Sequence, residues 1–368
     1  MANKGRSTGH RYASKNRYSD REIYSDSYHY GSRGGGNRGN KKAKKKWSAK
    51  KKVVVALCII LAIILLVVGI VFAYLKVTLS QIDRFELPKN PNDLKISSEI
   101  AEKYEDLDIV NIALFGVDSR EDNDIGRSDT IMILSIDKVH NKIKLSSIAR
   151  DTYVPIDGYG QTKLNHAYAY EGPELAIQTL NENFDMNIQS FVTVNFSQLA
   201  EIINYIGGIN MNISEDELAS TNEIIASMVG STDATPIPSS GESVHLTGAQ
   251  ALAYARNRTV GGDSQRTSRQ REVLSAMFTQ VKSMDLTQYP GLINMVLSQS
   301  VTSLSDSDMM GIGTWAITSG AEMEQLSLPN EECNASGELI DDVWYYVYDL
   351  DVATEILHNF IYEENTAQ

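Results

Sequence analysis

The segment IVNIALFGV, residues 109–117, is an apolar run that predicts a buried β-strand ending at Asp118. Two further strand-like runs follow at residues 131–136 and 142–149, joined by a short hairpin turn, and the second of them ends at Arg150. Because α/β sheets place ligands beyond the carboxyl ends of their strands, the charged residues at these ends are the first candidates for a functional site.

Helical periodicity dominates the chain downstream of these strands. Apolar residues recur at helical spacing in several segments, and one more strand-like run lies near residues 323–328. The predicted helices are 172–184, 196–206, 247–256, 267–284, 288–299, 307–319 and 349–361. Mixed strands and long helices predict an α/β fold, and we expect a three-layer α/β/α domain with a central mixed sheet.

Upstream of this domain, residues 53–75 form an uncharged apolar segment, VVVALCIILAIILLVVGIVFAYL. A helix of this length, rising about 1.5 Å per residue, crosses a hydrocarbon core of roughly 30 Å with some tilt. The segment is too long and begins too far from Met1 for a cleaved signal peptide, and no A-x-A-like site follows it. We therefore predict a single transmembrane helix that stays in place as a signal-anchor.

Charge predicts the direction of this helix. Residues 1–52 contain 16 Lys or Arg and three acids, a net charge of +13, so with −13 for the whole chain the remainder carries −26. The positive-inside rule then leaves the N-terminus in the cytoplasm and the acidic domain outside the cell membrane. The tail has almost no aliphatic residues and is expected to be disordered. Because orientation and contact with anionic lipid explain its charge, no nucleic-acid partner is expected.

The predicted organisation therefore has four parts. They are a disordered basic cytoplasmic tail at 1–52, the transmembrane signal-anchor at 53–75, a stalk or connecting segment at 76–105 and one extracellular domain at 106–368. The two cysteines, Cys58 in the span and Cys333 in the domain, cannot pair within one chain. Neither a disulfide framework nor a cysteine metal site is expected.

The part of the chain after the predicted span is acidic, yet five of its nine arginines fall within residues 256–271, RNRTVGGDSQRTSRQR. A cluster of like charge in an acidic domain suggests an anionic ligand, and guanidinium groups suit bidentate recognition of phosphate. Arg256 and Arg258 would leave opposite sides of one helix, so gripping the same ligand requires that helix to stop near Arg256. The alternative interpretation is a solvated helical face with local salt bridges.

The second half of this run carries its own pattern. Gly261–Gly262, with Asp263 beside them, allow the backbone to come close to a ligand. Arg266, Arg269 and Gln270 then follow at i, i+3 and i+4 spacing and share one helical face. A helix end and a helix start would in this way close on one anion from two sides.

A second group of polar residues follows the strand at 109–117. It consists of Asp118 and the segment GRSDT at 126–130, in which Arg127 and Asp129 have the spacing of an extended chain. Two carboxylates near a bound diphosphate suggest a Mg²⁺ site. The Asp, Asn and Gly residues that precede this segment are turn formers, and a simple turn explains the spacing equally well.

A third group follows the strand that ends near Arg150. It reads IARD at 148–151 and KLNHAY at 163–168, which includes Lys163 and His166. A single histidine of this kind is more often a packed or capping residue than a catalytic base. The sequence contains no Ser–His–Asp order, no HExxH and no P-loop.

Together these motifs resemble the LytR–CpsA–Psr family. Six of them stand in the family's order between residues 108 and 284: GVDSR, GRSDT, IARD, KLNHAY, TGxQALAYARxR and RTxRQ. Any one alone would be a weak signal, but six in order are specific. The short N-terminal tail and single span are similar to the family as well. One departure is Ala149, where the family often has proline, and it leaves Arg150 in place.

The resemblance implies an enzyme that moves anionic glycopolymers, such as wall teichoic acid or capsular polysaccharide, from an undecaprenyl-diphosphate carrier to a peptidoglycan hydroxyl. Its partners would be the carrier-linked polymer, peptidoglycan and membrane lipid. Carried over to this sequence, the family's roles are metal binding (Mg²⁺ or Mn²⁺) for Asp118 and Asp129, diphosphate binding for Arg150, Lys163, Arg256, Arg258 and Gln270, and catalysis for Arg127, Asp263 and Arg266.

The residues suit such chemistry, because phosphoryl transfer depends on positioning and charge neutralisation. A carboxylate would take the proton of the acceptor hydroxyl, and the sequence leaves Asp263 and Asp129 both open for that role. The polyprenyl chain needs apolar surroundings. Segments 199–206 and 273–281 offer candidates, although core packing is their simpler interpretation.

Two alternatives belong to other functional classes. A lipid-diphosphate hydrolase would use the same residues with water as the acceptor. A membrane-bound regulatory protein, such as a transcriptional attenuator, would have to contact DNA through its tail, because the arginine cluster lies across the membrane from DNA. The sequence leaves the identity of the polymer open and assigns residues 285–368 only a structural role.

Overall fold

The computed structural model describes residues 84–117, 126–228, 235–285, 288–298 and 300–363. Within these residues, no helix has the length and apolar character needed to cross a membrane. The predicted cytoplasmic tail at 1–52 and the predicted span at 53–75 lie outside the described residues.

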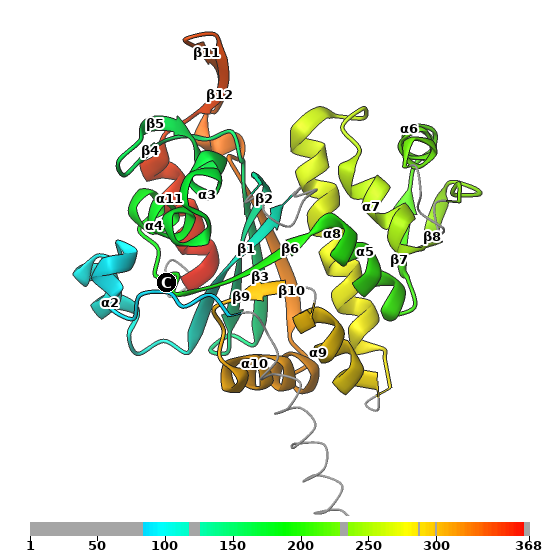
Figure 1. The fold of residues 1–368 in the computed structure, drawn as a ribbon, viewed down its shortest axis with the longest axis horizontal. Helices are drawn as coiled ribbons and strands as arrows, with labels where there is room; N and C mark the ends of the chain where they lie inside the picture. Colours follow the sequence, from blue (N-terminus) through cyan, green and yellow to red (C-terminus); the bar gives the residue numbers. More distant parts are fainter. Residues whose placement is uncertain (1–83, 118–125, 229–234, 286–287, 299, 364–368) are drawn as a thin grey trace, which may run out of the picture. The chain divides into compact units, whose positions relative to one another are not determined.

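A six-stranded mixed sheet forms the centre of the domain, in the order β10-β3-β2-β1-β6-β9 (Figure 1). Its strands are β1 (Ile109–Val117), β2 (Ser128–Asp137), β3 (Lys142–Ile148), β6 (Ser190–Asn195), β9 (Ser300–Thr302) and β10 (Glu322–Leu328). β1, β2 and β3 are antiparallel neighbours, whereas β6 runs parallel to β1 and β10 parallel to β3. This confirms the predicted α/β fold with a central mixed sheet.

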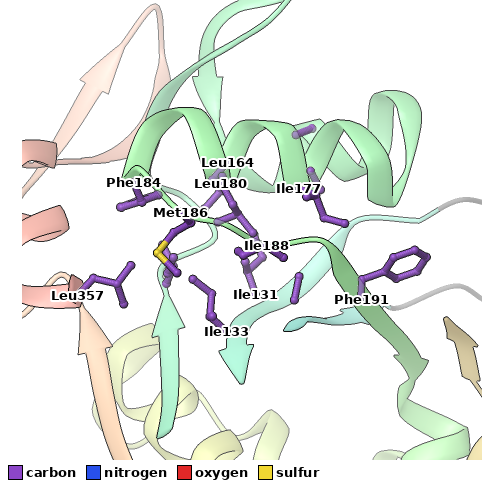
Figure 2. Packing of buried hydrophobic residues seen from close by; sticks show 14 of the residues in the cluster. Ile131, Ile133, Leu164, Ile177, Leu180, Phe184, Met186, Ile188, Phe191 and Leu357 are labelled. Atoms are coloured by element: carbon purple, nitrogen blue, oxygen red, sulfur yellow. The ribbon is translucent and has the colours of Figure 1, made fainter. Parts of the chain in front are cut away.

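Helices pack against both faces of this sheet because its central strands are apolar on both sides. Ala113 and Phe115 of β1 belong to a buried cluster with α3 (Leu164–Glu171), α4 (Pro173–Phe184) and α11 (Leu350–Tyr362). Figure 2 shows part of this cluster. Ile112 faces the other way and joins a second cluster with Phe278 of α8 (Gly262–Lys282) and Trp315 of α10 (Asp306–Thr318).

A further hydrophobic cluster lies beside the sheet and includes the middle of α8. The elements around it are α5 (Phe196–Tyr205), α6 (Glu215–Ser227), α7 (Gly248–Arg256), α9 (Tyr289–Ser298), β7 (Ile209–Ile213) and β8 (Gly241–Leu246). Apolar residues from both segments considered for the polyprenyl chain, among them Ile203 and Val273, are buried in this cluster. Core packing is therefore their role in this structure.

Most predicted elements occur within a few residues of their expected bounds, but several short ones were not predicted. These short elements include α3, β6 to β9, the hairpin of β4 (Tyr153–Ile156) with β5 (Gly160–Lys163), and the hairpin of β11 (Ser336–Ile340) with β12 (Val343–Val347), and the longer helix α6 was not predicted either. These strands are three to six residues long. Runs this short give too few repeats to establish a period from sequence.

Part of the segment expected to connect the span with the domain packs on the first core. A 3-10 turn, η1 (Pro91–Leu94), precedes α2 (Ser98–Tyr104). Leu94, Ile100 and Tyr104 are buried, and the ring of Tyr104 stacks on that of Tyr362 in α11 with centroids 3.7 Å apart. Cys333, at the end of a second 3-10 turn, η3 (Glu331–Cys333), is buried with a free thiol.

Candidate functional site

The centre of the site lies at the open end of the β2–β3 hairpin. Asp129 is the second residue of β2, and Arg150 follows the end of β3 by two residues. Because the two strands are antiparallel neighbours, these ends meet, and the Arg150 guanidinium forms an ion pair with the Asp129 carboxylate. Arg150 Nε also lies 3.4 Å from Asp151 Oδ2. Both side chains of the Arg150–Asp129 pair are partly exposed, so a ligand can reach them.

The β4–β5 hairpin brings a second cation to the same place. Lys163 ends β5 and precedes α3, and its Nζ donates a hydrogen bond of 2.7 Å to Asp151 Oδ1. Arg127, just before β2, is exposed. Burial lowers the pKa of His166, and the charges of Arg127 and Lys163 lower it further.

Helix α8 supplies Arg266 and Gln270 from its first turns. Arg266 is 3% exposed, and its Nη2 donates to the backbone oxygen of Asp129 over 3.3 Å. Gln270 is 7% exposed, and its Oε1 is buried with no hydrogen-bond partner among the described residues. The helix begins at Gly262 after the N-cap Gly261, and these two residues have φ of +69° and +77°, values that favour glycine over residues with a Cβ. Arg266 thus places the start of α8 beside Asp129.

The end of α7 carries the next two arginines. Thr247 and Gln250 form a capping box that starts this helix, which ends at Arg256 as the argument from spacing required. Asn257 is extended and buried, with its side chain bonded to α6. Around an extended residue, the two neighbouring side chains leave on the same side of the chain. Arg256 is half-buried and Arg258 exposed, as suits groups that contact a ligand at the surface.

The remaining two arginines of the cluster have other roles. Arg269 was grouped with Arg266 and Gln270 on one helical face, but its side chain turns to α6 and the α7–α8 connection. It donates to Glu217 at 2.9 Å, and to the backbone oxygens of Asn257 and Val260. It therefore holds the segment that carries Arg258 rather than a ligand.

Arg271 contacts Ser147 of β3, and burial lowers the pKa of its guanidinium.

Several buried polar atoms near Arg150 have no hydrogen-bond partner within the described part of the chain. They are Ser128 Oγ and Thr130 Oγ1 on either side of Asp129, Ser146 Oγ on β3, and Asn165 Oδ1. The Asn165 backbone N–H donates to the oxygen of Arg150 over 3.0 Å, which places the KLNHAY motif beside the site. Sequence reasoning quoted the motifs of Thr130 and Asn165 but assigned these two residues no role.

Two predicted residues cannot be placed in this geometry. Asp118 lies outside the described residues, and Asp263 is the second residue of α8 but its side chain is not described. Asp129 offers one carboxylate to a divalent cation, although Arg150 already contacts its Oδ1. A carboxylate with a second oxygen and nearby hydroxyls fits the oxygen donors that Mg²⁺ prefers.

Among the described residues, one group of two acidic side chains and a histidine has the spacing of metal ligands, and it lies away from the Asp129–Arg150 site. Asp137, His140 and Glu363 bring one potential ligand atom each to within 4.8 Å of one another. These residues sit at the turn end of the β2–β3 hairpin, and the buried ammonium of Lys144 contacts both carboxylates. A cation therefore already occupies the centre of this group.

In this α/β domain, cations from two β-hairpins and one helix meet around Asp129 and Asp151. The chain belongs to the LytR_cpsA_psr family, whose model matches residues 72–360. This confirms the resemblance seen in the six motifs.

Named relatives and solved structures agree with this assignment. A relative from Oceanobacillus iheyensis, named polyisoprenyl-teichoic acid–peptidoglycan teichoic acid transferase TagU, is 33% identical over 288 residues, which are 76% of this chain and 83% of that protein. A solved structure described as TagT bound to LI-WTA has a TM-score of 0.57 and 25% identity, and the match covers 69% of this chain and 91% of the other. Another, the family protein YwtF (TagT) with bound octaprenyl pyrophosphate lipid, has a TM-score of 0.53 and 25% identity, covering 69% and 90%.

Proposed function

We propose that this protein transfers an anionic glycopolymer from a polyprenyl-diphosphate carrier to a hydroxyl of peptidoglycan. The observation that carries the proposal is the meeting of Arg150, Lys163 and Arg266 around Asp129 and Asp151 at the end of the β2–β3 hairpin. The names of the relatives support the polymer and its acceptor. The octaprenyl pyrophosphate in a related structure supports the carrier.

The charges of this site suit a diphosphate. Arg150 and Lys163 each share a carboxylate in this structure, so an arriving diphosphate would replace Asp129 or Asp151 as their partner. Arg256, Arg258 and Gln270 would bind it from the α7–α8 side, where guanidinium forks match phosphate oxygens. The acceptor oxygen would bond to the polymer-linked phosphorus while the bond from that phosphorus to the lipid phosphate breaks, and Arg127 and Arg266 would stabilise the negative charge that develops on the leaving polyprenyl phosphate. Such preorganised cations lower the barrier because they need no rearrangement during the reaction.

Proton transfer and the metal complete the proposed reaction. Asp263 and Asp129 are the two candidates for the base that takes the proton of the acceptor hydroxyl. Asp129, with Asp118, would hold Mg²⁺ or Mn²⁺, which supplies charge neutralisation on the diphosphate. Asp129→Ala is expected to lower transfer and to weaken its dependence on Mg²⁺ concentration. An unchanged metal response in this variant would remove Asp129 from the metal site.

The location follows from the sequence. We propose that residues 53–75 anchor the chain in the cell membrane as a single-pass helix, with residues 1–52 in the cytoplasm and the domain outside. This arrangement keeps the site beside the membrane that holds a polyprenyl carrier. Protease treatment of intact protoplasts should digest the domain and spare the tail, and protection of the domain would contradict the orientation.

The decisive experiment is transfer by the purified full-length chain in detergent, with a polyprenyl-diphosphate-linked teichoic acid as donor and peptidoglycan as acceptor. Polymer covalently joined to peptidoglycan supports the transferase. Released polymer and free lipid phosphate without a joined product would instead support a hydrolase that uses the same residues.

Arg258→Ala tests the arginine clamp in this assay, because the side chain is exposed and its loss should leave the fold intact. We expect transfer to be nearly abolished. Arg258→Lys keeps the charge without the planar fork and should recover only part of the activity. The matched control is Lys138→Ala, which removes one positive charge from an exposed pair with Asp108 far along the hairpin. Near-normal transfer by Arg258→Ala would remove this residue from the mechanism.

A further inference from the structure

The hairpin of β11 and β12 projects from the domain at the end of the molecule where β4 and β5 lie (Figure 1). Sequence analysis assigned this region no function. Its register pairs Leu339 with Trp344 and Gly337 with Tyr346. Directly paired residues share a face of a two-stranded ribbon, so these four residues form one face, and Tyr345 belongs to the other.

The base of the hairpin touches the site. On the face that meets the domain, the ring of Tyr345 packs on that of Tyr153 with centroids 4.7 Å apart, and Lys163 Nζ lies 5.8 Å from the Tyr345 ring. The backbone N–H of Tyr346 donates to the backbone oxygen of Asp151 over 2.9 Å. The hairpin therefore contacts both Lys163, the second cation of the site, and Asp151, the residue that pairs with it.

The opposite face of the hairpin exposes an oriented indole. A Cβ built on Gly337 would lie only 2.8 Å from Nε1 of Trp344, so the indole lies over a strand position where glycine makes room for it. The edge of Tyr346 supports it, with the two rings at 85° and centroids 5.0 Å apart. Trp344 remains 40% exposed and Leu339 74% exposed.

This face continues into an open groove with a volume of about 560 Å³ that reaches α8. Its walls are polar and come from two sides. Gln265, Ser268 and Arg271 belong to α8, Asn330 and Glu331 to the segment between β10 and the hairpin, and Tyr346 to β12 of the hairpin. Gln265 directly precedes Arg266 in α8, so the groove and the site lie along neighbouring sides of the same helix turn.

The charge of the hairpin limits what this surface binds. Residues 336–347 contain Glu338, Asp341 and Asp342 and no lysine or arginine. An acidic tip repels an anionic polymer and the anionic surface of a bacterial membrane. A ligand with uncharged rings and many hydroxyl groups is compatible with this surface. Carboxylates accept hydrogen bonds from hydroxyl groups, and side-chain amides both accept and donate them. The C–H face of a sugar ring packs on the π-face of an aromatic ring.

We propose that the Trp344 face and the groove beside α8 bind the acceptor, as a glycan chain of neutral sugar rings. This inference rests on the proposed function and assigns its second substrate to a surface separate from the diphosphate site. The glycan would run along the groove between α8 and residues 330–346, so that a ring hydroxyl reaches the carrier's diphosphate beside Arg266. Trp344 is a binding residue that holds one ring and takes no part in the chemistry.

The test measures transfer by the full-length chain as the concentration of soluble glycan strands is varied at saturating donor. Trp344→Ala should raise the KM for the glycan about tenfold, as expected for the loss of one stacked aromatic face, and leave kcat and the KM of the donor unchanged. Trp344→Phe should recover most of the affinity. Gly337→Ala keeps the indole but displaces it, and should raise the same KM by a smaller factor.

The matched control is Val343→Ala, a neighbouring residue that is 39% exposed but lies on the other face, and its KM should be unchanged. A direct titration with β-1,4-linked N-acetylglucosamine tetramer, followed by tryptophan fluorescence, measures binding without the reaction. Wild-type chain should bind the tetramer, and Trp344→Ala should lose this binding.

The outcomes separate the two proposals. Absence of transfer by wild-type chain would contradict the proposed function, and the tetramer titration would still decide whether the groove binds a glycan. Normal transfer with an unchanged glycan KM in both Trp344→Ala and Gly337→Ala would contradict glycan binding by the groove and leave the proposed transferase function standing. Loss of binding to phosphatidylglycerol vesicles in Trp344→Ala, with glycan binding unchanged, would assign the hairpin to the membrane instead.

Discussion

The two ends of the β2–β3 hairpin each carry a charged cluster, and the clusters are built in opposite ways. At the turn end, Asp137, Lys144 and Glu363 meet, and the side chains of Asp137 and Lys144 are fully buried. At the open end, Asp129 and Arg150 are partly exposed. The same strands thus present one closed cluster and one that solvent can reach.

The closed cluster satisfies its own groups. Lys144 Nζ has three donors, and they go to Asp137 Oδ2 at 2.7 Å, to Ile361 O at 2.8 Å and to Glu363 Oε1 at 2.9 Å. Since two of these acceptors belong to the end of α11 or follow it, the cluster fastens that helix to the sheet. A cluster with one buried cation and all its donors used has no capacity for a ligand.

The open cluster leaves groups in need of a partner. Its cations outnumber its described carboxylates, and buried oxygens of Thr130, Asn165 and Gln270 have no hydrogen-bond partner within the part of the chain that the structure describes. The comparison teaches that the residue types alone do not mark a site. Burial and hydrogen-bond satisfaction distinguish the closed cluster, which holds the fold, from the open cluster, which solvent can reach.

The largest effect should come from breaking the closed cluster. Lys144→Met would leave the Asp137 carboxylate buried without its cation, at a cost of about 3–5 kcal/mol in the free energy of unfolding. Urea denaturation of the full-length chain measures this. Transfer per folded molecule should be retained, because the cluster lies at the far end of the strands. A stability within 1 kcal/mol of wild type would show that Lys144 does not fasten α11.

Breaking the open cluster should affect transfer and spare stability. Arg150→Gln is expected to reduce transfer by about 10²- to 10³-fold, as for the loss of one preorganised charge contact, which corresponds to roughly 3–4 kcal/mol. The free energy of unfolding should change by no more than about 1 kcal/mol, because the pair is partly exposed. Transfer kinetics and urea denaturation of the same variant test this prediction. A variant that is clearly less stable yet transfers at the normal rate would show that Arg150 holds the fold and is not needed for transfer.

Acid should weaken the closed cluster in a defined window. Burial alone would raise the pKa of Glu363, but hydrogen bonds from Lys142 and Lys144 outweigh it and lower the pKa from 4.5 to about 2. A lowered carboxylate pKa stabilises the fold above the unfolded value, and this stability is lost as pH falls from 4.5 towards 2. Glu363→Gln should reduce the dependence of the unfolding free energy on pH in that window. Some dependence should remain, because the pKa of Asp137 is lowered as well.

An equal slope for wild type and Glu363→Gln between pH 4.5 and 2 would contradict this assignment.

The smallest effect is expected for Asp151→Asn at the open end. Asp151 is buried, but asparagine keeps an oxygen that accepts a hydrogen bond from Lys163 Nζ, so the free energy of unfolding should change by about 1 kcal/mol. Binding of octaprenyl diphosphate should become tighter by a few-fold, because Lys163 no longer shares a carboxylate with the ligand. Calorimetric titration measures this, and clearly weaker binding would show that Asp151 holds Lys163 in a position that the ligand requires.

Much of the fold followed from local patterns. The apolar run at 109–117 and the helical segments at 172–184 and 349–361 were predicted because their periodicity persists over three turns of helix or a full strand. The β11–β12 hairpin and the 3-10 turn at Pro91–Leu94 were missed, because such short elements are stabilised mainly by their contacts with the domain.

The candidate site shows the same division. The sequence alone determined the clustering of arginines, the position at which α7 ends and the order of the family motifs, since these depend on residue type and spacing. Only the tertiary structure decided that Arg266 reaches Asp129 while Arg269, one turn along the same helix, holds Asn257 and Val260. Spacing along a helix tells which side chains share a face, but the neighbours that pack against that face determine what each side chain contacts.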